Sequence, residues 1–262
     1  MQRNRQIIAI GGISKTNDGA LFNYVLKQAV ATSPRIGFLP TASADSDDHI
    51  VRFYEAFTAL ACRPSHLKLF GRVRDPATFI EEQDIILVGG GNTKTMLGVW
   101  REWALDSLIR DAWESGTVIA GFSAGAICWF QEALSDSWAD RLAVVVGLGF
   151  LPGSCCPHFS NEPDRRPTYH RLLLAGAISS GLGIDDDCAV HFCDASPSRV
   201  VKATAAANAY TVSVGGGSIF ETPLESEVVL LQAGAVEEEP PRPTDRETPS
   251  AARSGDSPRS GS

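Results

Sequence analysis

The stretch Val118-Ile119-Ala120-Gly121-Phe122-Ser123-Ala124-Gly125 decides the fold of this chain. An apolar run leads directly into the pattern Gly-x-Ser-x-Gly, and small residues that suit a helix follow it. This is the pattern of a nucleophile elbow, in which a buried strand ends, the chain turns sharply and a helix begins. Glycine is needed on both sides of the serine because a bulky side chain there would collide with the neighbouring strand or helix. The pattern therefore predicts a strained Ser123 whose hydroxyl is exposed, with Ala124 at the start of the helix.

Similar apolar runs precede this turn, and helix-like segments separate them. The sequence predicts strands over residues 7–10, 35–39, 66–70, 84–88 and 117–120. It also predicts helices over 23–32 and 49–62, and one or two helices over 93–115. Continuous apolar strands that alternate with helices indicate an α/β fold: a three-layer sandwich whose mostly parallel sheet is covered on both faces. Ligands of such sheets bind at the carboxyl ends of the strands, where Ser43, Gly90 and Ser123 fall.

The pattern loosens after residue 126. Shorter strands, some of them antiparallel, are expected over 189–192, 198–204, 209–214 and 227–232. From residue 236 the chain becomes rich in Glu, Pro, Ser, Arg and Asp and loses all apolar periodicity. We therefore predict one catalytic domain over residues 1–235 and a disordered tail over 236–262.

Composition argues against several classes of function. The chain has 262 residues, of which 44% are hydrophobic and 21% charged, and its formal net charge is −8. The absence of a basic stripe argues against a nucleic-acid partner. Apolar runs stay well below the ~18 residues of a membrane span, and the run at residues 7–10 is too short for a secretory signal. We therefore expect a cytoplasmic protein with no membrane partner.

The six cysteines lack the C-x-x-C spacing of a zinc site. Most lie in apolar surroundings, so we expect reduced, buried thiols and no metal. Cys155 and Cys156 come just before His158, where they would line a pocket without taking part in chemistry.

A serine hydroxyl is a weak nucleophile at neutral pH and needs a base within hydrogen-bond reach. Among the five histidines, His158 stands out because it lies in a predicted loop over residues 153–161, directly after an apolar run. Loops at strand ends carry many catalytic groups. The remaining histidines lie in helical, strand or surface contexts: His49, His66, His170 and His191.

The base in turn needs an acid to orient it. Four carboxylates near the serine and the histidine are candidates, and the residues alone do not rank them: Glu132, Asp136, Asp140 and Glu162.

The negative oxygen formed during acyl transfer needs two hydrogen-bond donors. One is the amide of Ala124, the residue after the nucleophile. The other is expected from Gly89-Gly90-Gly91, because a glycine run at a strand end lets the backbone approach a ligand closely. The same segment also fits an ordinary strand-to-helix turn capped by Asn92 or Thr93.

Four segments together resemble the peptidase S51 family, which contains aspartyl dipeptidase (peptidase E) and cyanophycinase. They lie at residues 88–93, 121–126, 135–137 and 157–159, and the resemblance spans about residues 5–232. It implies a fold like that of class I glutamine amidotransferases, with serine in place of their cysteine, and no cofactor.

Carried over residue by residue, the resemblance implies that Ser123 is the nucleophile, His158 the general base and Asp136 the acid, while Gly90 completes the oxyanion hole. The interval from Ser123 to Asp136 is shorter here than in peptidase E. The three other candidate carboxylates therefore stay open.

The resemblance also implies dipeptide substrates with an N-terminal aspartate, whose carboxylate is bound by an arginine downstream of the histidine. Arg166 is the preferred residue and Arg165 the alternate, and Asn92 is also assigned to substrate binding. A guanidinium suits this role because it matches a carboxylate with two parallel hydrogen bonds.

The sequence thus predicts a serine peptidase that hydrolyses short peptides through an acyl-enzyme, without metal or cofactor. Its partner is a small peptide substrate, and a homodimer is left open. Three alternatives remain: a cyanophycinase-like β-aspartyl exopeptidase, an α/β-hydrolase esterase, and a non-catalytic amidotransferase-like binding protein. The esterase is disfavoured because its histidine normally follows near the C-terminus of the chain.

Overall fold

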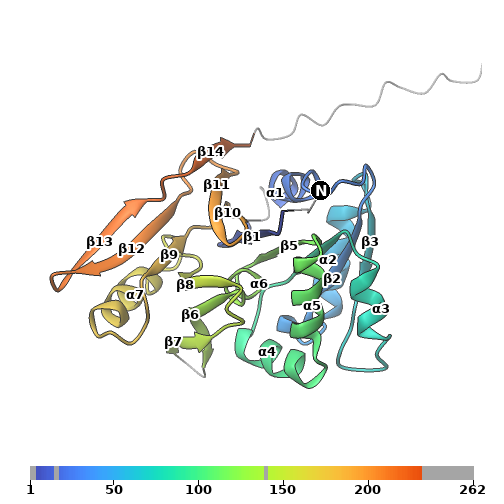
Figure 1. Cartoon of the computed structure of the whole chain (residues 1–262), viewed down its shortest axis with the longest axis horizontal. Coiled ribbons are helices and arrows are strands. Elements are labelled where there is room, and N and C mark those ends of the chain that lie inside the picture. Colours follow the sequence, from blue (N-terminus) through green and yellow to red (C-terminus); the bar gives the residue numbers. More distant parts are fainter. Residues whose placement is uncertain (1–3, 15–17, 139–140, 232–262) are drawn as a thin grey trace, which may run out of the picture.

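The computed structural model describes residues 4–14, 18–138 and 141–231, which form two β-sheets with helices packed around them. An eight-stranded sheet occupies one half of the molecule and a six-stranded sheet the other (Figure 1). The C-terminal tail predicted over 236–262 lies outside the described residues.

The eight-stranded sheet has the strand order β14-β11-β10-β1-β5-β4-β2-β3. Its central strands β1, β5, β4, β2 and β3 run parallel to their neighbours, whereas β10 is antiparallel to both β1 and β11. The apolar runs of the sequence form its interior, and all four residues of β4 are buried. The strands span Gln6–Ile10 (β1), Arg35–Leu39 (β2), Arg63–His66 (β3), Ile85–Val88 (β4), Val118–Phe122 (β5), Cys188–Cys193 (β10), Ser196–Lys202 (β11) and Glu227–Leu230 (β14).

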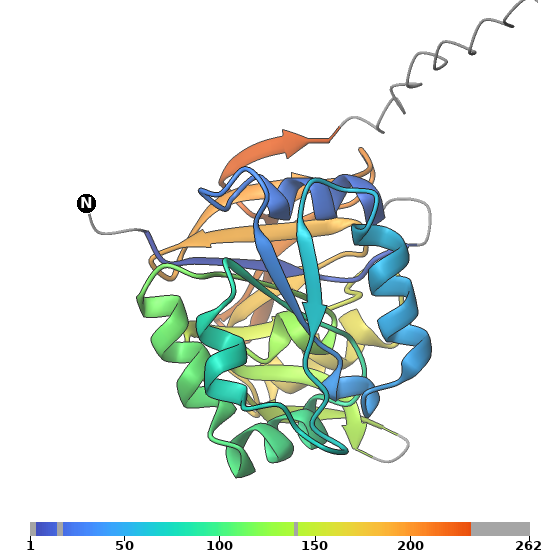
Figure 2. The same ribbon diagram turned by 90° about the vertical axis from the view of Figure 1, so that its right-hand side faces the viewer.

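Helices cover both faces of this sheet (Figure 2). One face packs against α1 (Asp18–Leu26) and α2 (Asp47–Phe57). The opposite face packs against α3 (Pro76–Glu81), α4 (Thr93–Glu102) and α5 (Leu105–Glu114). A short 3-10 helix, Thr41–Ser43, follows β2. The predicted α/β sandwich with a mostly parallel sheet is confirmed.

Of the strands in the second sheet, the sequence predicted only the one over residues 209–214, which is β12; the strands predicted over 189–192, 198–204 and 227–232 belong to the first sheet as β10, β11 and β14. The second sheet has the strand order β13-β12-β9-β8-β6-β7, and it mixes parallel and antiparallel pairs. Several of its strands are unusual in composition, such as β9 with the sequence GLGI. Its elements are β6 (Phe130–Trp138), β7 (Arg141–Val146), β8 (Leu151–Cys156), β9 (Gly181–Ile184), β12 (Ala209–Gly215) and β13 (Ser218–Pro223), and α7 (Arg165–Leu174) packs on it.

Two predicted elements are clearly displaced along the chain. The first helix is α1 at Asp18–Leu26 rather than 23–32, because the chain after Leu26 closes short turns and then meets Ser33-Pro34. The third strand is β3 at Arg63–His66 rather than 66–70. Pro64 is tolerated within it because β3 is the edge strand of the sheet.

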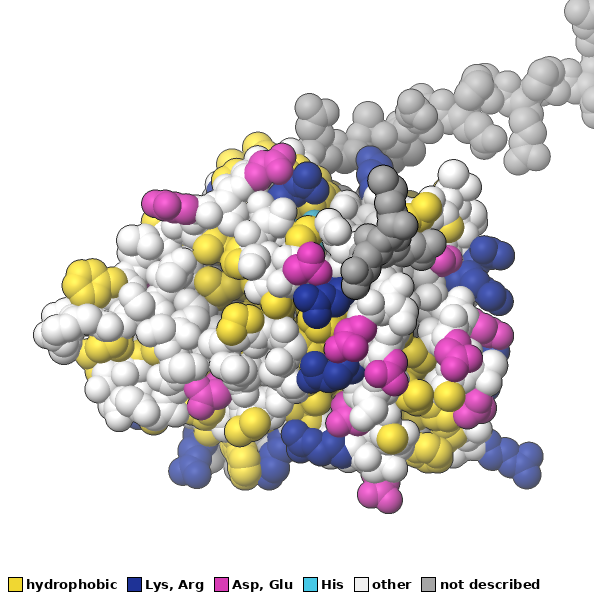
Figure 3. Space-filling view, in the orientation of Figure 1, with side chains coloured by type: hydrophobic (Ala, Val, Ile, Leu, Met, Phe, Trp, Pro, Cys, Tyr) yellow, Lys and Arg dark blue, Asp and Glu magenta, His cyan; other side chains and the backbone are white. Residues whose placement is uncertain are grey.

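On the face shown in Figure 3, basic and acidic side chains are interspersed, with apolar side chains between them. That face therefore presents no extended basic stripe. Within the described ranges, no helix has both the length and the apolar content needed to cross a membrane.

Candidate active site

The predicted turn is present between β5 and the short helix α6 (Ala124–Ile127). Ser123 sits at φ 53° and ψ −115°, a strained backbone conformation for a residue with a side chain. A Cβ on Gly121 would overlap the backbone of Gly125, and a Cβ on Gly125 would overlap the carbonyl of Val88. Both glycines are thus required by close backbone packing, as the sequence predicted.

The imidazole of His158 reaches this serine. His158 lies beyond the end of β8, and its Nε2 is 2.9 Å from the Oγ of Ser123. Its backbone also has a positive φ, of 53°. Its side chain is only 17% exposed, so the ring is held between protein groups. The structure therefore brings together the predicted serine and histidine.

The carboxylate that contacts the other side of the ring is Asp186. Its Oδ1 lies 2.6 Å from Nδ1 of His158. The amide of Asp186 donates a hydrogen bond of 2.8 Å to the side-chain oxygen of Asn161, which fixes the loop relative to the histidine. A carboxylate in this position holds the ring in the tautomer with Nδ1 protonated, so that Nε2 can accept the serine proton.

Sequence topology explains why Asp186 and not Asp136 fills this position. Strands β8 and β9 are parallel neighbours, and Cys156 pairs with Gly183. Residues 158 and 186 therefore emerge side by side just past two adjacent strand ends. Asp136 instead lies within β6, 66% exposed, and contacts Nη2 of Arg165 at 3.4 Å. The assignment of Asp136 as the acid partner of His158 is wrong.

The other candidate acids also lie away from the imidazole. Glu132 accepts a hydrogen bond from the amide of Ser179. Glu162 accepts one of 2.7 Å from Nε of Arg165. Asp140 falls outside the described residues.

A signal for Asp186 existed in the sequence, in the three consecutive aspartates that follow the apolar residues of β9. Each has a different task. Asp185 is buried and accepts hydrogen bonds from the amides of Ser160 and Asn208, which ties together the loops around the histidine. Asp187 accepts from the backbone and hydroxyl of Ser14. Because ligands bind at the carboxyl ends of the strands, a carboxylate just past a buried strand is as good a candidate for the site as a histidine there.

The sequence predicted an oxyanion hole formed by two backbone amides. In the described part of the chain, the N–H groups of Gly90 and Ala124 have no hydrogen-bond acceptor. An ideal Cβ on Gly90 would lie 3.4 Å from Cβ of Ser123, so this glycine adjoins the nucleophile. The next residue, Gly91, has φ 136° and packs directly on the carbonyl of Ala42, where no larger residue fits.

A cavity of about 240 Å³ opens over Ser123 and His158. Asn92 lines it and also caps α4, because its Oδ1 accepts a hydrogen bond of 2.8 Å from the amide of Thr95. The predicted helix cap is therefore present, whereas substrate binding by Asn92 stays a prediction. The complete lining is Gly91, Asn92, Ser123, Asp136, Ser137, His158, Glu162 and Arg165.

The two arginines differ in their position. Arg165 lines this cavity, with a buried guanidinium held by Glu162 and Asp136. Arg166, the preferred substrate-binding residue, does not line it. Its guanidinium stacks on the rings of Phe159 and Tyr210, and further bonds join it to Ser160 and Glu221.

The thiols near the site are not positioned as nucleophiles. Cys155 and Cys156 are fully buried, and burial raises the pKa of each thiol well above its ordinary value. Neither lines the cavity over Ser123. Thiols of this kind stay protonated and unreactive.

Residues 7–200 match peptidase family S51. The chain belongs to this family. A relative from Bacillus subtilis (strain 168), the uncharacterized peptidase YgaJ, is 48% identical over 224 residues, covering 84% of this chain and 97% of the relative. Peptidase E of Escherichia coli O1:K1 / APEC is 34% identical over 112 residues, which cover 41% of this chain and 49% of that enzyme.

The crystal structure of a peptidase from an acI-B1 actinobacterium shares the fold of this S51 chain. It superposes with a TM-score of 0.66 at 17% sequence identity, covering 86% of this chain and 96% of the other. Family membership identifies the chain as a peptidase.

Proposed function

We propose that this chain is a serine peptidase that removes the N-terminal residue from short peptides, dipeptides above all. The observation that carries the proposal is the unbroken contact from the Oγ of Ser123 through the ring of His158 to Asp186, at 2.9 Å and 2.6 Å. The strained backbone of Ser123 supports it, since such strain clusters at working sites.

The reaction follows from these positions. His158 Nε2 takes the proton of Ser123 while Oγ attacks the peptide carbonyl, and the amides of Gly90 and Ala124 bind the oxygen that becomes negative. His158 then gives that proton to the leaving amine as the C–N bond breaks, which leaves an acyl ester on Ser123. Water then attacks the ester with the same histidine as base, which releases the acid product and regenerates the free hydroxyl of Ser123. Asp186 stabilises the imidazolium in both halves.

The charges of the cavity over Ser123 favour a substrate with a free N-terminus. Asp136 and Glu162 both line it, against one guanidinium from Arg165. Their side chains are 66% and 49% exposed, so they are accessible to a ligand. The α-ammonium of an unblocked peptide would balance the excess negative charge.

An N-terminal aspartate, the residue that the family resemblance implies, would be bound by Arg165 rather than Arg166. Arg165 is the cation among the described lining residues of the Ser123 cavity. Its contact with the exposed Asp136 is long, at 3.4 Å. Because Asp136 is 66% exposed, a substrate carboxylate that takes its place on Arg165 leaves no buried anion without a partner.

A second candidate, a β-aspartyl-arginine exopeptidase, is favoured by the same two carboxylates. A substrate guanidinium would form charge-assisted hydrogen bonds with Asp136 and Glu162. This candidate predicts faster cleavage of β-Asp-Arg than of Asp-Leu.

The test is a panel of Asp-Leu, Ala-Leu, Lys-Leu, N-acetyl-Asp-Leu and β-Asp-Arg, together with labelling by a fluorophosphonate probe. We expect Asp-Leu to be cleaved best, its acetylated form to be cleaved at least about tenfold more slowly, and Ser123 to be labelled. Ser123→Ala should remove both labelling and cleavage, whereas Ser196→Ala, on an exposed strand position, should change neither. Cleavage that survives Ser123→Ala would overturn the proposal.

A further inference from the structure

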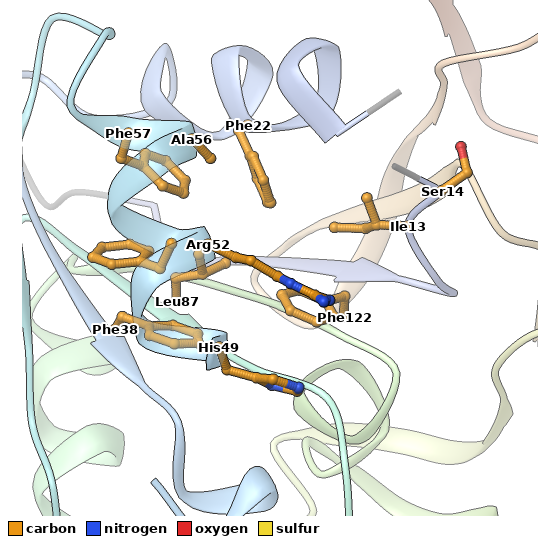
Figure 4. A pocket seen from close by; sticks show the side chains of 11 residues that line it. Ile13, Ser14, Phe22, Phe38, His49, Arg52, Ala56, Phe57, Leu87 and Phe122 are labelled. Atoms are coloured by element: carbon orange, nitrogen blue, oxygen red, sulfur yellow. The ribbon is translucent and has the colours of Figure 1, made fainter. Parts of the chain in front are cut away.

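A second cavity, of about 170 Å³, has in its wall Phe122, the residue directly before the nucleophile, and shares no lining residue with the cavity over Ser123. It is enclosed by α1, α2 and the carboxyl ends of the parallel strands (Figure 4). Aromatic and aliphatic side chains form most of its wall: Ile13, Phe22, Phe38, Phe53, Phe57 and Phe122. An apolar cavity of roughly 150 Å³ is large enough for a benzene ring, so this one fits a single apolar side chain.

One wall of this cavity connects it to the nucleophile. Phe122 lines the cavity and directly precedes Ser123. An ideal Cβ on Gly90 would lie 3.4 Å from both the ring of Phe122 and Cβ of Ser123. The ring of Phe122 and the side chain of Ser123 therefore both lie next to Gly90, whose amide is predicted to form part of the oxyanion hole.

Another wall connects the cavity to the base. Gly12 packs so closely on the imidazole of His158 that a Cβ there would overlap the ring. The next two residues, Ile13 and Ser14, line the cavity. The amine that leaves the acyl carbon after receiving a proton from His158 would therefore depart close to these residues.

The mouth of the cavity carries two basic side chains from one face of α2, His49 and Arg52. In Figure 4 the side chain of Arg52 extends across the cavity toward Phe122, and the ring of His49 lies next to it. Asp48 and Glu55 share the helix with Arg52, yet within the described ranges Arg52 has no ion pair with them. The guanidinium is thus available for an anion.

We infer that this cavity is the subsite for the leaving residue of the substrate, which carries an apolar side chain and a free C-terminal carboxylate. The inference rests on the proposed serine peptidase function and names the second half of its substrate. The apolar side chain fills the aromatic cavity, and Arg52 binds the carboxylate, as a guanidinium does with two parallel hydrogen bonds. The free α-carboxylate limits the substrate to a dipeptide, because a longer peptide would place an uncharged amide at Arg52.

The experiment compares Asp-Phe, Asp-Leu and Asp-Gly, each as the free acid and as the C-terminal amide, with wild-type protein and two variants. For the wild type, we expect kcat/KM for Asp-Phe and Asp-Leu to exceed that for Asp-Gly at least about tenfold. Ala56→Trp fills the cavity and should erase this preference, mainly through KM. Arg52→Gln should lower kcat/KM about fivefold for the free acids and leave the amides unchanged.

Matched controls are Ala59→Trp and Arg101→Gln, both at exposed positions outside the cavity lining. They should retain the wild-type preferences. Free phenylalanine should compete with Asp-Leu, and phenylalanine amide should compete less well.

Labelling of Ser123 by the fluorophosphonate separates the two ways of failing. If Ser123 is labelled but the wild type cleaves Asp-Gly as fast as Asp-Phe, or Ala56→Trp keeps the preference, the subsite inference is overturned while the serine mechanism stands. If Ser123 is neither labelled nor needed for cleavage, both proposals fall.

Discussion

Gly12 and Asp186 face each other in an isolated parallel β-bridge, and no side chain fits between them. A Cβ on Gly12 would overlap Oδ1 of Asp186 and lie 2.5 Å from Nδ1 of His158. The amide of Asp187 donates to the carbonyl of Gly12 at 2.9 Å, which closes the contact. The end of β1 therefore serves as a backbone platform on which the carboxylate and the imidazole meet.

This contact predicts the effect of Gly12→Ala. The added methyl group has to separate Asp186 from His158, because both the backbone and the ring are held by packing. We expect kcat to fall at least about 100-fold, since a misplacement of about 1 Å in a catalytic group has that effect. Gly19→Ala, where an added Cβ meets nothing, is the matched control in the same assay. A Gly12→Ala enzyme with wild-type kcat would contradict the arrangement.

Asp186→Asn and Asp136→Asn distinguish the two carboxylates directly. Replacing the group that orients the imidazole leaves the wrong tautomer and lowers kcat by roughly 10⁴ in enzymes with such a triad. Asp186→Asn should show a loss of this size, with little change in KM. Asp136→Asn should mainly raise KM for unblocked dipeptides, because that carboxylate lies in the cavity and does not touch the ring.

The measurement is steady-state kinetics on Asp-Leu with both purified variants, checked for folding by circular dichroism. A loss of kcat in Asp136→Asn but not in Asp186→Asn would show that Asp186 does not orient His158.

The elbow and the parallel sheet could be predicted because their signals are local. The run before Ser123 is continuous, apolar and ends in obligatory glycines, and β2 and β4 carry the same kind of run. His158 could be found because a single polar loop follows an apolar segment. In each of these cases a few neighbouring residues contain the whole argument.

The acid could not be ranked in this way, because its position depends on which strands are neighbours. Asp186 reaches His158 only because β8 and β9 pair in parallel, and β9 consists of glycine, leucine and isoleucine alone. The role of Arg166 was equally hidden, because its ring partner Tyr210 lies on the remote strand β12. Contacts between distant segments are fixed by tertiary packing rather than by local pattern.

Arg166→Gln should affect stability more than specificity. The guanidinium stacks on Phe159 at 4.5 Å and contacts Glu221 at 3.2 Å. Loss of such stacking and of a partly exposed ion pair costs about 1–2 kcal/mol of unfolding free energy. We expect a lower Tm and an unchanged ratio of kcat/KM for Asp-Leu over Ala-Leu. A selective loss of Asp-Leu cleavage would instead place Arg166 in the binding of the substrate carboxylate.

The stability of the protein should fall between pH 6.5 and pH 4 because of His191. Burial, with a smaller contribution from the charge of Arg199, lowers the pKa of this imidazole from 6.5 to about 4. The neutral ring is held by Tyr24 at Nδ1, 2.8 Å away, and by Gln6 at Nε2, 3.0 Å away. Between these pH values the imidazole of His191 is protonated in the unfolded chain but stays neutral in the folded chain. The stabilisation present above pH 6.5 is therefore progressively lost as the pH falls. The loss amounts to up to about 3 kcal/mol.

Urea unfolding at pH 7.5 and pH 4.5 measures this loss of unfolding free energy. The variant His191→Gln cannot titrate at this position, so its unfolding free energy should differ less between the two pH values than that of the wild type. An equal difference in both proteins would assign the acid sensitivity to other groups.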